Sequence, residues 1–484
     1  MRKTIETNGY YLPPGFFSAH LKFGTQVFER GGTRVHLRMP EVSGLLLADV
    51  AAHVRQAQGS YLYTLPVERI IDVLDRASRR WLDKQYPARQ TAIEAMHVLT
   101  GFSREMIAAS IDLEMESSRK DDMWRALCSE IKNPLYLDDF QRSADLNGWC
   151  RAYGPGLVVS FFSENIPALP HLVYMRSALV KAACIGKAAS GEPVFAPLYL
   201  HTIEELDPGM AACMAALSWR GGSADVERAA FDSADAFIVF GGVEACDSLL
   251  GRIPRSKKVL VHGHKIGFGI IGRTALNRTT AKDLAAAIAE DHAMFDQQAC
   301  LAPQAYYVER GGEVGGPELA ELVARALAQI EQRMPRGAIS AGEAAALHQF
   351  RTRAEVQEIA AGERVMCCSP GSTKWTVVCE QTPQALAPSP GNRTVRLWMV
   401  DDIFDLFAML QPVQGFLQNA AVAVGDAREV DFIRELGTLG VCRITAPGMM
   451  PLPSMMWHHD GIAALSSLLR WCDIEKREAP EGLE

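Results

Sequence analysis

A cysteine at position 300 has the residue type and the setting that covalent acyl chemistry requires. It lies in residues 291–304 (DHAMFDQQACLAPQ), where a predicted helix ends and a predicted strand follows. A thiolate suits an acyl thioester, because it exchanges with another thiol and then holds the acyl group covalently. A lone cysteine is nevertheless more often a buried filler, since reactivity requires a lowered thiol pKa. The assignment of Cys300 as a nucleophile therefore needs support from other residues.

Three more segments carry residues suited to an oxyanion or a dinucleotide. In chain order the four segments are residues 163–167 (SENIP), 186–190 (GKAAS), 240–245 (FGGVEA) and 298–300 (QAC). The first three follow predicted strands, and ligands of open α/β sheets bind at the carboxyl ends of the strands. A glycine pair at the start of a helix also lets the backbone approach a phosphate closely.

With these segments in this order, the chain resembles the aldehyde dehydrogenase superfamily, and within it the acyl-CoA reductase (LuxC) branch known from the fatty acid reductase of bacterial bioluminescence. The resemblance runs from about Gly154 to Glu475. It implies an α/β, aldehyde-dehydrogenase-like fold with a Rossmann-type doubly wound cofactor domain and a second α/β catalytic domain. It further implies NADPH-dependent reduction of a fatty acyl thioester, expected to be long-chain and carried by CoA or a protein, to the aldehyde.

The resemblance assigns the acyl chemistry to two residues. Cys300 matches the nucleophile of the superfamily, with Gln298 two residues before it, so the intermediates are a thioester on Cys300 and then a thiohemiacetal. Asn165 matches the asparagine whose side-chain amide, together with the backbone N–H of Cys300, donates to the developing oxyanion. The alternative for Asn165 is that it only caps a turn before Pro167.

Four residues are expected to bind the cofactor. Lys187 matches the lysine that hydrogen-bonds the ribose, although it is also compatible with an ordinary surface lysine. Ser190 occupies the position where many NAD-using relatives carry a glutamate for the ribose 2'-hydroxyl, so a 2'-phosphate is not repelled and NADPH is favoured. Gly241 and Gly242 stand between a predicted strand and a predicted helix, although such pairs also serve as plain turns.

Residues 261–265 (VHGHK) stand where hydrolytic aldehyde dehydrogenases have Glu-Leu-Gly-Gly-Lys, and Val261 replaces the glutamate. That carboxylate is the general base that activates water for deacylation. Its absence argues against oxidation of aldehydes to free acids. The proton donor to the aldehyde oxygen stays open, with His262, His264 and His292 as candidates, although a histidine chosen from sequence is more often structural.

The elements that must position these residues alternate along the chain. Apolar strands at residues 156–162, 236–240 and 257–263 alternate with helices, one of them expected at residues 204–218, which predicts a parallel sheet covered on both faces. The predicted domains are 1–275 for the N-terminal region and dinucleotide-binding domain and 276–450 for the catalytic domain. Residues 451–484 form a C-terminal segment and arm, with apolar residues at 463–469 that describe a buried helix face.

Composition narrows the class of protein. The chain has 484 residues, 48% hydrophobic and 22% charged, as expected of a globular protein. The net charge of -8 gives no electropositive field for nucleic acid. No apolar run is long enough to span a membrane, and we expect a cytoplasmic protein. The 11 cysteines include no CxxC pair, so neither a disulfide framework nor a metal site is predicted.

Two other functions stay open. One is an ordinary NAD(P)-dependent aldehyde dehydrogenase, against which Val261 counts; the other is a non-catalytic subunit of a multienzyme complex. As for partners, the resemblance implies an acyl-CoA or acyl-protein substrate, an acyl-protein synthetase and an acyltransferase, and a homo-oligomer.

Overall fold

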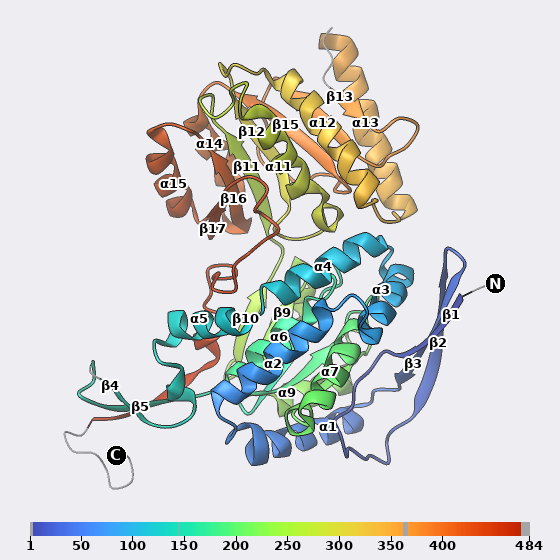
Figure 1. Ribbon diagram of the computed structural model, residues 1–484, viewed down its shortest axis with the longest axis vertical. Helices are drawn as coiled ribbons and strands as arrows, with labels where there is room; N and C mark the ends of the chain where they lie inside the picture. Colours follow the sequence, from blue (N-terminus) through green and yellow to red (C-terminus); the bar gives the residue numbers. More distant parts are fainter. Residues whose placement is uncertain (1–2, 144, 362–365, 476–484) are drawn as a thin grey trace. The chain divides into compact units, whose positions relative to one another are not determined.

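The computed structural model describes residues 3–143, 145–361 and 366–475 of the chain (Figure 1). The chain forms two compact units. The first comprises Met1–Thr100, Ile107–Gly263 and Ser454–Glu484, and the second comprises Gly101–Met106 and His264–Pro453. The sequence places the domain boundaries at 275 and 450, whereas the compact units divide at Gly263 and Pro453.

The first unit contains a five-stranded parallel sheet in the order β10-β9-β6-β7-β8. Its strands are β6 (Leu157–Phe161), β7 (Ala183–Lys187), β8 (Met214–Leu217), β9 (Ala236–Phe240) and β10 (Lys258–His262). All four neighbouring pairs are parallel. The order runs one way from β6 to β8 and the other way from β9 to β10, which is the doubly wound arrangement that the apolar strands predict. Ligands of such sheets bind at this switch point, outside the carboxyl ends of the strands.

Helices and two small sheets complete the first unit. The helices are α1 (Gly44–Ala57), α2 (Val67–Leu82), α3 (Pro87–Thr100), α5 (Lys120–Ile131), α6 (Pro170–Leu179), α7 (Phe195–Leu206), α8 (Pro208–Ala211), α9 (Ala224–Ser233) and α10 (Val243–Leu250); α4 (Arg104–Glu116) begins at residues assigned to the second unit. One small sheet joins β1 (Lys3–Asn8), β3 (Thr33–Pro40) and β2 (Phe23–Arg30), and the other joins β18 (Arg470–Ile474), β5 (Gly148–Tyr153) and β4 (Gln141–Ser143).

The second unit is built on a seven-stranded sheet in the order β13-β14-β15-β12-β11-β16-β17. The strands are β11 (Ile266–Ile271), β12 (Pro303–Glu309), β13 (Met366–Cys368), β14 (Thr376–Glu380), β15 (Thr394–Val400), β16 (Leu417–Ala423) and β17 (Arg443–Thr445), and only β13 is antiparallel to its neighbour. The helices are α11 (Ala281–Ala293), α12 (Gly316–Arg333), α13 (Ala341–Ala361), α14 (Leu406–Leu410) and α15 (Arg428–Leu439).

Helices cover both faces of this second sheet. Trp398 of β15 belongs to a buried cluster with Leu406 of α14 and Phe432 of α15. The next residue, Met399, approaches Gly316 at the start of α12 so closely that a Cβ there would lie 2.4 Å from its sulfur. Because neighbouring side chains of a strand point to opposite faces, these contacts place α12 and the α14–α15 pair on opposite sides of the sheet.

One predicted helix is wrong. Residues 204–218 contain the end of α7, the short α8 and strand β8 rather than a single helix. Pro208 cannot continue α7, and the side chain of Asp207 accepts from the backbone N–H of Met210 to begin α8. The apolar residues of β8 are buried because they form the edge of the parallel sheet beside β7, and not one face of a helix.

The expected helix face at residues 463–469 is also wrong. This segment holds only a 3-10 turn, Ser466–Leu468, followed by the arm strand β18. The carboxylate of Glu130 accepts from the backbone N–H groups of Ala464, Leu465 and Ser466, at 3.1, 2.8 and 2.7 Å. A side chain distant in sequence thus satisfies the backbone groups that a helix would have bonded internally. Within the described residues, no helix is both long and apolar enough to cross a bilayer.

A buried carboxylate at the end of β12 makes the second unit sensitive to acid. Arg428 donates to both oxygens of Glu309, at 2.7 and 2.9 Å, and the guanidinium of Arg273 donates to one of them at 2.6 Å. Burial alone raises the pKa of Glu309, but these hydrogen bonds outweigh it and lower the pKa to about 2. The lowered pKa means that this carboxylate stabilises the fold above its unfolded pKa and loses that effect as the pH falls toward 2.

We therefore expect Glu309→Gln to lower the free energy of unfolding at pH 7, by on the order of 2 kcal/mol. The difference between wild type and variant should shrink as the pH falls from about 5 to about 2. Urea unfolding at several pH values measures it, with Glu355→Gln on an exposed part of α13 as the control. A difference that stayed constant over this range would show that Glu309 does not supply the pH dependence.

Candidate active site

Cys300 lies in the second unit, in a turn between α11 and β12, as the sequence predicts. It is a free cysteine of intermediate exposure. The backbone N–H of Gln298 donates to the carbonyl of Phe295 at 2.9 Å, and that of Ala302 donates to the carbonyl of Ala299 at 3.0 Å, so the chain turns sharply on both sides of the thiol. The side chain is thereby presented on a short, tightly hydrogen-bonded loop rather than within a helix or strand.

The residues just before this loop adopt an unusual backbone conformation. Phe295, Asp296 and Gln297 have φ values of 55°, 50° and 64°, so three consecutive non-glycine residues are left-handed. Each such residue costs roughly 1–3 kcal/mol unless its surroundings hold it in place. The direction in which the chain approaches Cys300 therefore depends on contacts that hold these three residues.

Asp296 supplies the first of these contacts. Its carboxylate accepts from Nε of Arg393 at 2.9 Å and from the backbone N–H of Gly337 at 2.9 Å. Arg393 in turn donates to Glu331 at 2.9 Å. Asp296 and Arg393 are both buried. Burial raises the pKa of Asp296, while the charge of Arg393 opposes that rise. Removing one partner of such a buried ion pair strongly destabilises the fold, because the other charge is left buried and unpaired.

Gln297 supplies the second set of contacts. Its carbonyl oxygen accepts from the backbone N–H of Thr394 at 2.8 Å. Its amide nitrogen lies 2.8 Å from the carbonyl of Pro303, 3.1 Å from that of Thr394 and 3.1 Å from the hydroxyl of Ser389. Gln297 thus ties the loop to the first residues of β12 and β15. Sequence analysis missed Asp296 and Gln297, since their polar character gave no sign that they are buried.

Three of the predicted site residues, one catalytic and two cofactor-binding, lie at the carboxyl ends of strands of the sheet in the first unit. Asn165 lies in the loop after β6, Lys187 is the last residue of β7, and Gly241 follows β9. They therefore share the carboxyl edge of one parallel sheet. Cys300 belongs to the second unit.

Lys187 is partly buried near an aromatic ring and two carboxylates. Its ammonium lies 5.7 Å from the centre of the Trp219 ring. Desolvation lowers its pKa, while the charges of Glu227 and Glu164 oppose that shift. An ammonium in this setting is a charged group at a strand end, where a ribose or phosphate oxygen would relieve part of its desolvation.

Ser190 lies exposed in a turn that Glu164 holds. The carboxylate of Glu164 accepts from the backbone N–H of Gly191 at 2.8 Å, and a Cβ at Gly191 would lie 2.4 Å from that carboxylate oxygen. The segment after β6 and the segment after β7 are thus joined by one hydrogen bond. Although Ser190 itself carries no charge, a carboxylate is present beside its turn.

The two glycines after β9 are not required by the packing of the chain. A Cβ at Gly241 would meet its nearest neighbour at 3.4 Å, and a Cβ at Gly242 would meet nothing within 4 Å. Neither residue has a positive φ. Gly186 is different, because a Cβ there would lie 2.2 Å from the hydroxyl of Tyr174. Gly241 and Gly242 leave open space at the N-terminus of α10, where a phosphate or a ring could approach the backbone.

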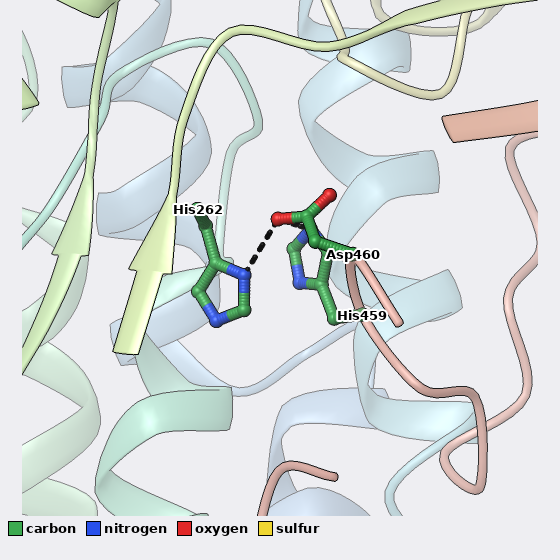
Figure 2. Close-up of side chains that lie close together, drawn as sticks. All are labelled: His262, His459 and Asp460. Atoms are coloured by element: carbon green, nitrogen blue, oxygen red, sulfur yellow. Dashed lines mark hydrogen bonds and ion pairs between the residues drawn. The ribbon is translucent and has the colours of Figure 1, made fainter. Parts of the chain in front are cut away.

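The structure separates the three candidate histidines. His292 is completely buried, with Nδ1 2.8 Å from the carbonyl of Ile288, and burial lowers its pKa to about 4, so it is neutral near pH 7. His264 is exposed and belongs to the second unit. His262 ends β10, and its Nδ1 lies 2.9 Å from a carboxylate oxygen of Asp460 (Figure 2). Of these three histidines, His262 is the one whose imidazole is paired with a carboxylate.

His262, Asp460 and His459 also lie close enough together to suggest a metal site. The rings of His262 and His459, however, are stacked, with centroids 4.0 Å apart and planes at 20°. The lone pairs of an imidazole lie in its ring plane, so two nearly parallel rings do not direct them at one point between them. The geometry favours a hydrogen-bonded pair over a metal centre.

Comparison with known proteins agrees with the fold. Residues 62–471 match the family of acyl-CoA reductases (LuxC). A long-chain acyl-protein thioester reductase of Photorhabdus luminescens is 25% identical over 247 residues, and one of Photorhabdus laumondii is 22% identical over 247 residues. The chain spans about half the length of these curated relatives, since each match covers 50% of both chains.

Solved aldehyde dehydrogenases share the fold. Aldehyde dehydrogenase 21 of Physcomitrella patens superposes with a TM-score of 0.72 at 11% identity, and the match covers 98% of each chain. An NADP-dependent enzyme of Escherichia coli superposes with a TM-score of 0.70 at 13% identity over 94% of each chain. These likenesses confirm the predicted aldehyde-dehydrogenase-like fold.

We expect the side chain of Gln297 to hold the loop before Cys300. Gln297→Ala and Gln297→Gly both remove its hydrogen bonds, so amide hydrogen exchange in residues 295–302 should speed up about tenfold in both. Glycine tolerates the left-handed backbone, so the glycine variant should be the more stable of the two by about 1 kcal/mol. Gln332→Ala at an exposed position of α12 is the control. Unchanged exchange in both variants would show that other contacts fix the loop.

Proposed function

Because the chain belongs to the acyl-CoA reductase (LuxC) family, we propose that it reduces a fatty acyl thioester to the aldehyde with NADPH, through an acyl group held on Cys300. The observation that carries this proposal is the Cys300 loop, a partly exposed thiol on a turn that buried Asp296 and Gln297 fix. A long-chain acyl group carried by a protein is favoured by the curated relatives, which are named long-chain acyl-protein thioester reductases.

In the first step the Cys300 thiolate attacks the acyl carbon and the thiol of the carrier leaves, so one thioester replaces another. The side-chain amide of Asn165 and the backbone N–H of Cys300 are proposed to donate to the oxyanion of this step. Each such donor is typically worth about 3 kcal/mol in the transition state. Partial exposure of Asn165 in the loop after β6 supports a role beyond that of a turn cap.

The carboxyl edge of the first sheet fits a dinucleotide. Lys187 and Ser190 would hold the ribose that carries the 2' group, and Gly241 and Gly242 leave room for the remainder at the start of α10. NADPH supplies the hydride that converts the acyl group to the aldehyde. The residues of the chain bind and orient it.

Val261 supports reduction over hydrolysis. It lies in β10, one residue before the strand ends, and a valine offers no base to activate water. An acyl group on Cys300 would therefore wait for hydride or for another thiol. This disfavours an ordinary aldehyde dehydrogenase, and the combination of Cys300, Asn165, Lys187 and the glycine pair disfavours a non-catalytic subunit. An acyl-protein synthetase, an acyltransferase and a second copy of the chain remain proposed partners, supported by the family alone.

The first functional prediction concerns the covalent acyl group. Incubation with a long-chain acyl-CoA without NADPH should add one acyl mass to the protein, on the peptide that contains Cys300. The adduct should be long-lived in buffer and should discharge at least about 100-fold faster when NADPH or free thiol is added, because no general base activates water. Intact-protein mass spectrometry and single-turnover analysis of a labelled acyl group measure both.

Two variants and one alternative product control this experiment. Cys300→Ala should abolish the adduct, whereas Cys128→Ala, which removes an exposed cysteine, should leave it unchanged. An adduct that persists in Cys300→Ala contradicts the assignment of the nucleophile. Rapid release of free fatty acid without NADPH or thiol would restore the hydrolytic aldehyde dehydrogenase, and a wild-type protein that neither acylates nor oxidises NADPH would favour the non-catalytic subunit.

The second functional prediction concerns cofactor choice. NADPH should exceed NADH in kcat/KM, and Ser190→Glu should weaken that preference tenfold or more. Glu164 already places one carboxylate beside this turn, so a second would repel the 2'-phosphate by about 1–2 kcal/mol. Ser190→Gln has the same length without the charge and should keep the preference. If the glutamate variant keeps it as well, another part of the chain recognises the 2' position.

A further inference from the structure

His262 and Asp460 form a buried imidazole–carboxylate pair within the first unit. Nδ1 of His262 lies 2.9 Å from Oδ2 of Asp460, and the two side chains are only 5% and 4% exposed. Figure 2 shows them pointing toward one another from β10 and from the C-terminal segment, which are distant in sequence. A carboxylate bonded to one nitrogen fixes the tautomer and the orientation of the ring, and it presents the other nitrogen for chemistry.

The surroundings hold this imidazole rigidly. Its ring stacks on Phe240 with centroids 4.8 Å apart, and on its other neighbour, His459, at 4.0 Å. Trp457 stacks on His459 in turn, at 4.5 Å. Asp460 itself has a φ of 55°, so its backbone is held in a left-handed conformation to place the carboxylate. Such strain concentrates at functional sites.

Nε2 of His262 is left for a ligand. Among the residues that the structure describes, the hydrogen-bond partner of His262 is Asp460, and that bond uses Nδ1. His292 lacks this arrangement, because its Nε2 is sealed in the interior without a partner. His262 is therefore better suited than His292 to exchange a proton with a bound molecule.

The position of His262 in the sheet indicates which part of a cofactor it would meet. It ends β10 opposite Phe240 of β9, and its backbone carbonyl accepts from the N–H of Gly241 at 3.3 Å. Each half of a doubly wound sheet takes one nucleotide of a dinucleotide. With Lys187 and the 2' group on the β7 side, the β9–β10 side is left for the nicotinamide nucleotide.

We propose that His262, oriented by Asp460, is the proton-transfer residue of the reduction, and that it protonates the acyl oxygen as the nicotinamide delivers its hydride. This inference rests on the proposed function. Hydride transfer requires the nicotinamide ring to contact the acyl carbon, and the proposal assigns His262 to the group beside that ring. Asp460 is a positioning residue, since it acts through His262.

The step balances in protons and electrons. The electron pair of the hydride forms the new C–H bond, and the π electrons of the C=O bond move onto the oxygen. That oxygen takes the proton from Nε2 of His262, so the products are a neutral thiohemiacetal, the oxidised cofactor and a neutral imidazole. In the collapse, Nε2 takes the hydroxyl proton back, the C=O bond forms and the C–S bond breaks. The electrons of the C–S bond leave on the cysteine sulfur. One proton from solvent then balances the thiolate.

Three charged or titratable groups lie near His262 in the first unit. Asp460 is the carboxylate, and it is paired with Nδ1 of His262. His459 is neutral near pH 7, because burial, with the charges of His262 and Arg176, lowers its pKa to about 3. Arg176 on α6 is the cation that acts on this cluster. Since the proposed step takes a proton from Nε2 of His262, the rate of reduction should fall as the pH rises.

The test separates acylation from reduction in the full-length protein. His262→Asn places an amide where Nδ1 lies and keeps a donor for Asp460, but offers nothing at Nε2; His262→Gln places an amide near Nε2 that does not titrate. We expect both variants to acylate from acyl-CoA and to bind NADPH like wild type. Reduction of the preformed acyl-enzyme by NADPH in a single turnover should slow by about 10²–10⁴-fold and lose its pH dependence.

The role of Asp460 has a distinct readout. Asp460→Asn keeps an acceptor for Nδ1 but removes the charge, so the midpoint of the pH profile for reduction should move to lower pH while acylation is unchanged. His348→Gln, an exposed histidine of α13, is the control for histidine removal. A merely structural role for Asp460 would lower stability or NADPH binding without moving that midpoint.

Three outcomes overturn the inference. They are reduction at the wild-type rate in both His262 variants, an acylation defect as large as the reduction defect, and a wild-type pH profile in Asp460→Asn. None of these outcomes contradicts the proposed function. The proposed function fails only if wild-type protein forms no acyl adduct or does not reduce it with NADPH. The two failures are therefore distinguishable in one set of measurements.

Discussion

The geometry around the thiol depends on one constraint, the left-handed run of Phe295, Asp296 and Gln297. Three such residues together cost several kcal/mol, roughly 1–3 kcal/mol each, and only a buried network can offset that. Asp296 and Gln297 supply it through Arg393 and the backbone of Thr394 and Pro303. Because these partners lie at or just before the first residues of β12 and β15, the position of the Cys300 thiol is tied to the sheet, and a shift of those strands would move it.

The strands and their ends were accessible from the sequence. The apolar runs at residues 157–161, 236–240 and 258–262 are strands because near-continuous apolar residues suit a sheet covered on both faces. Lys187 and the glycines after β9 lie at the carboxyl edge for the same reason. The error at residues 204–218 shows the limit, since a short edge strand after a helix has the same apolar composition as a helix face.

The contacts that hold the predicted site residues in place could not be predicted from the sequence, because they join residues distant in sequence. Nothing in the local sequence indicates that Glu164 holds the turn of Ser190, that Arg393 pairs with Asp296, or that Asp460 orients His262. His262, His264 and His292 are equivalent candidates in the sequence. In the structure they differ in burial and in partner. His292 is buried, His264 is exposed, and His262 is paired with a carboxylate.

The fold itself does not decide between reduction and hydrolysis, since solved aldehyde dehydrogenases share it at 11–13% identity. Under the proposed function, two neighbouring residues of β10 decide between the two reactions. Val261 removes the base that would activate water, and His262 brings an imidazole held by a carboxylate to the end of the same strand. An acyl thioester is hydrolysed when a base activates water, and it is reduced when the developing oxyanion is stabilised and protonated. In the proposed mechanism, the absence of this base and the presence of His262 as proton donor together favour the second course.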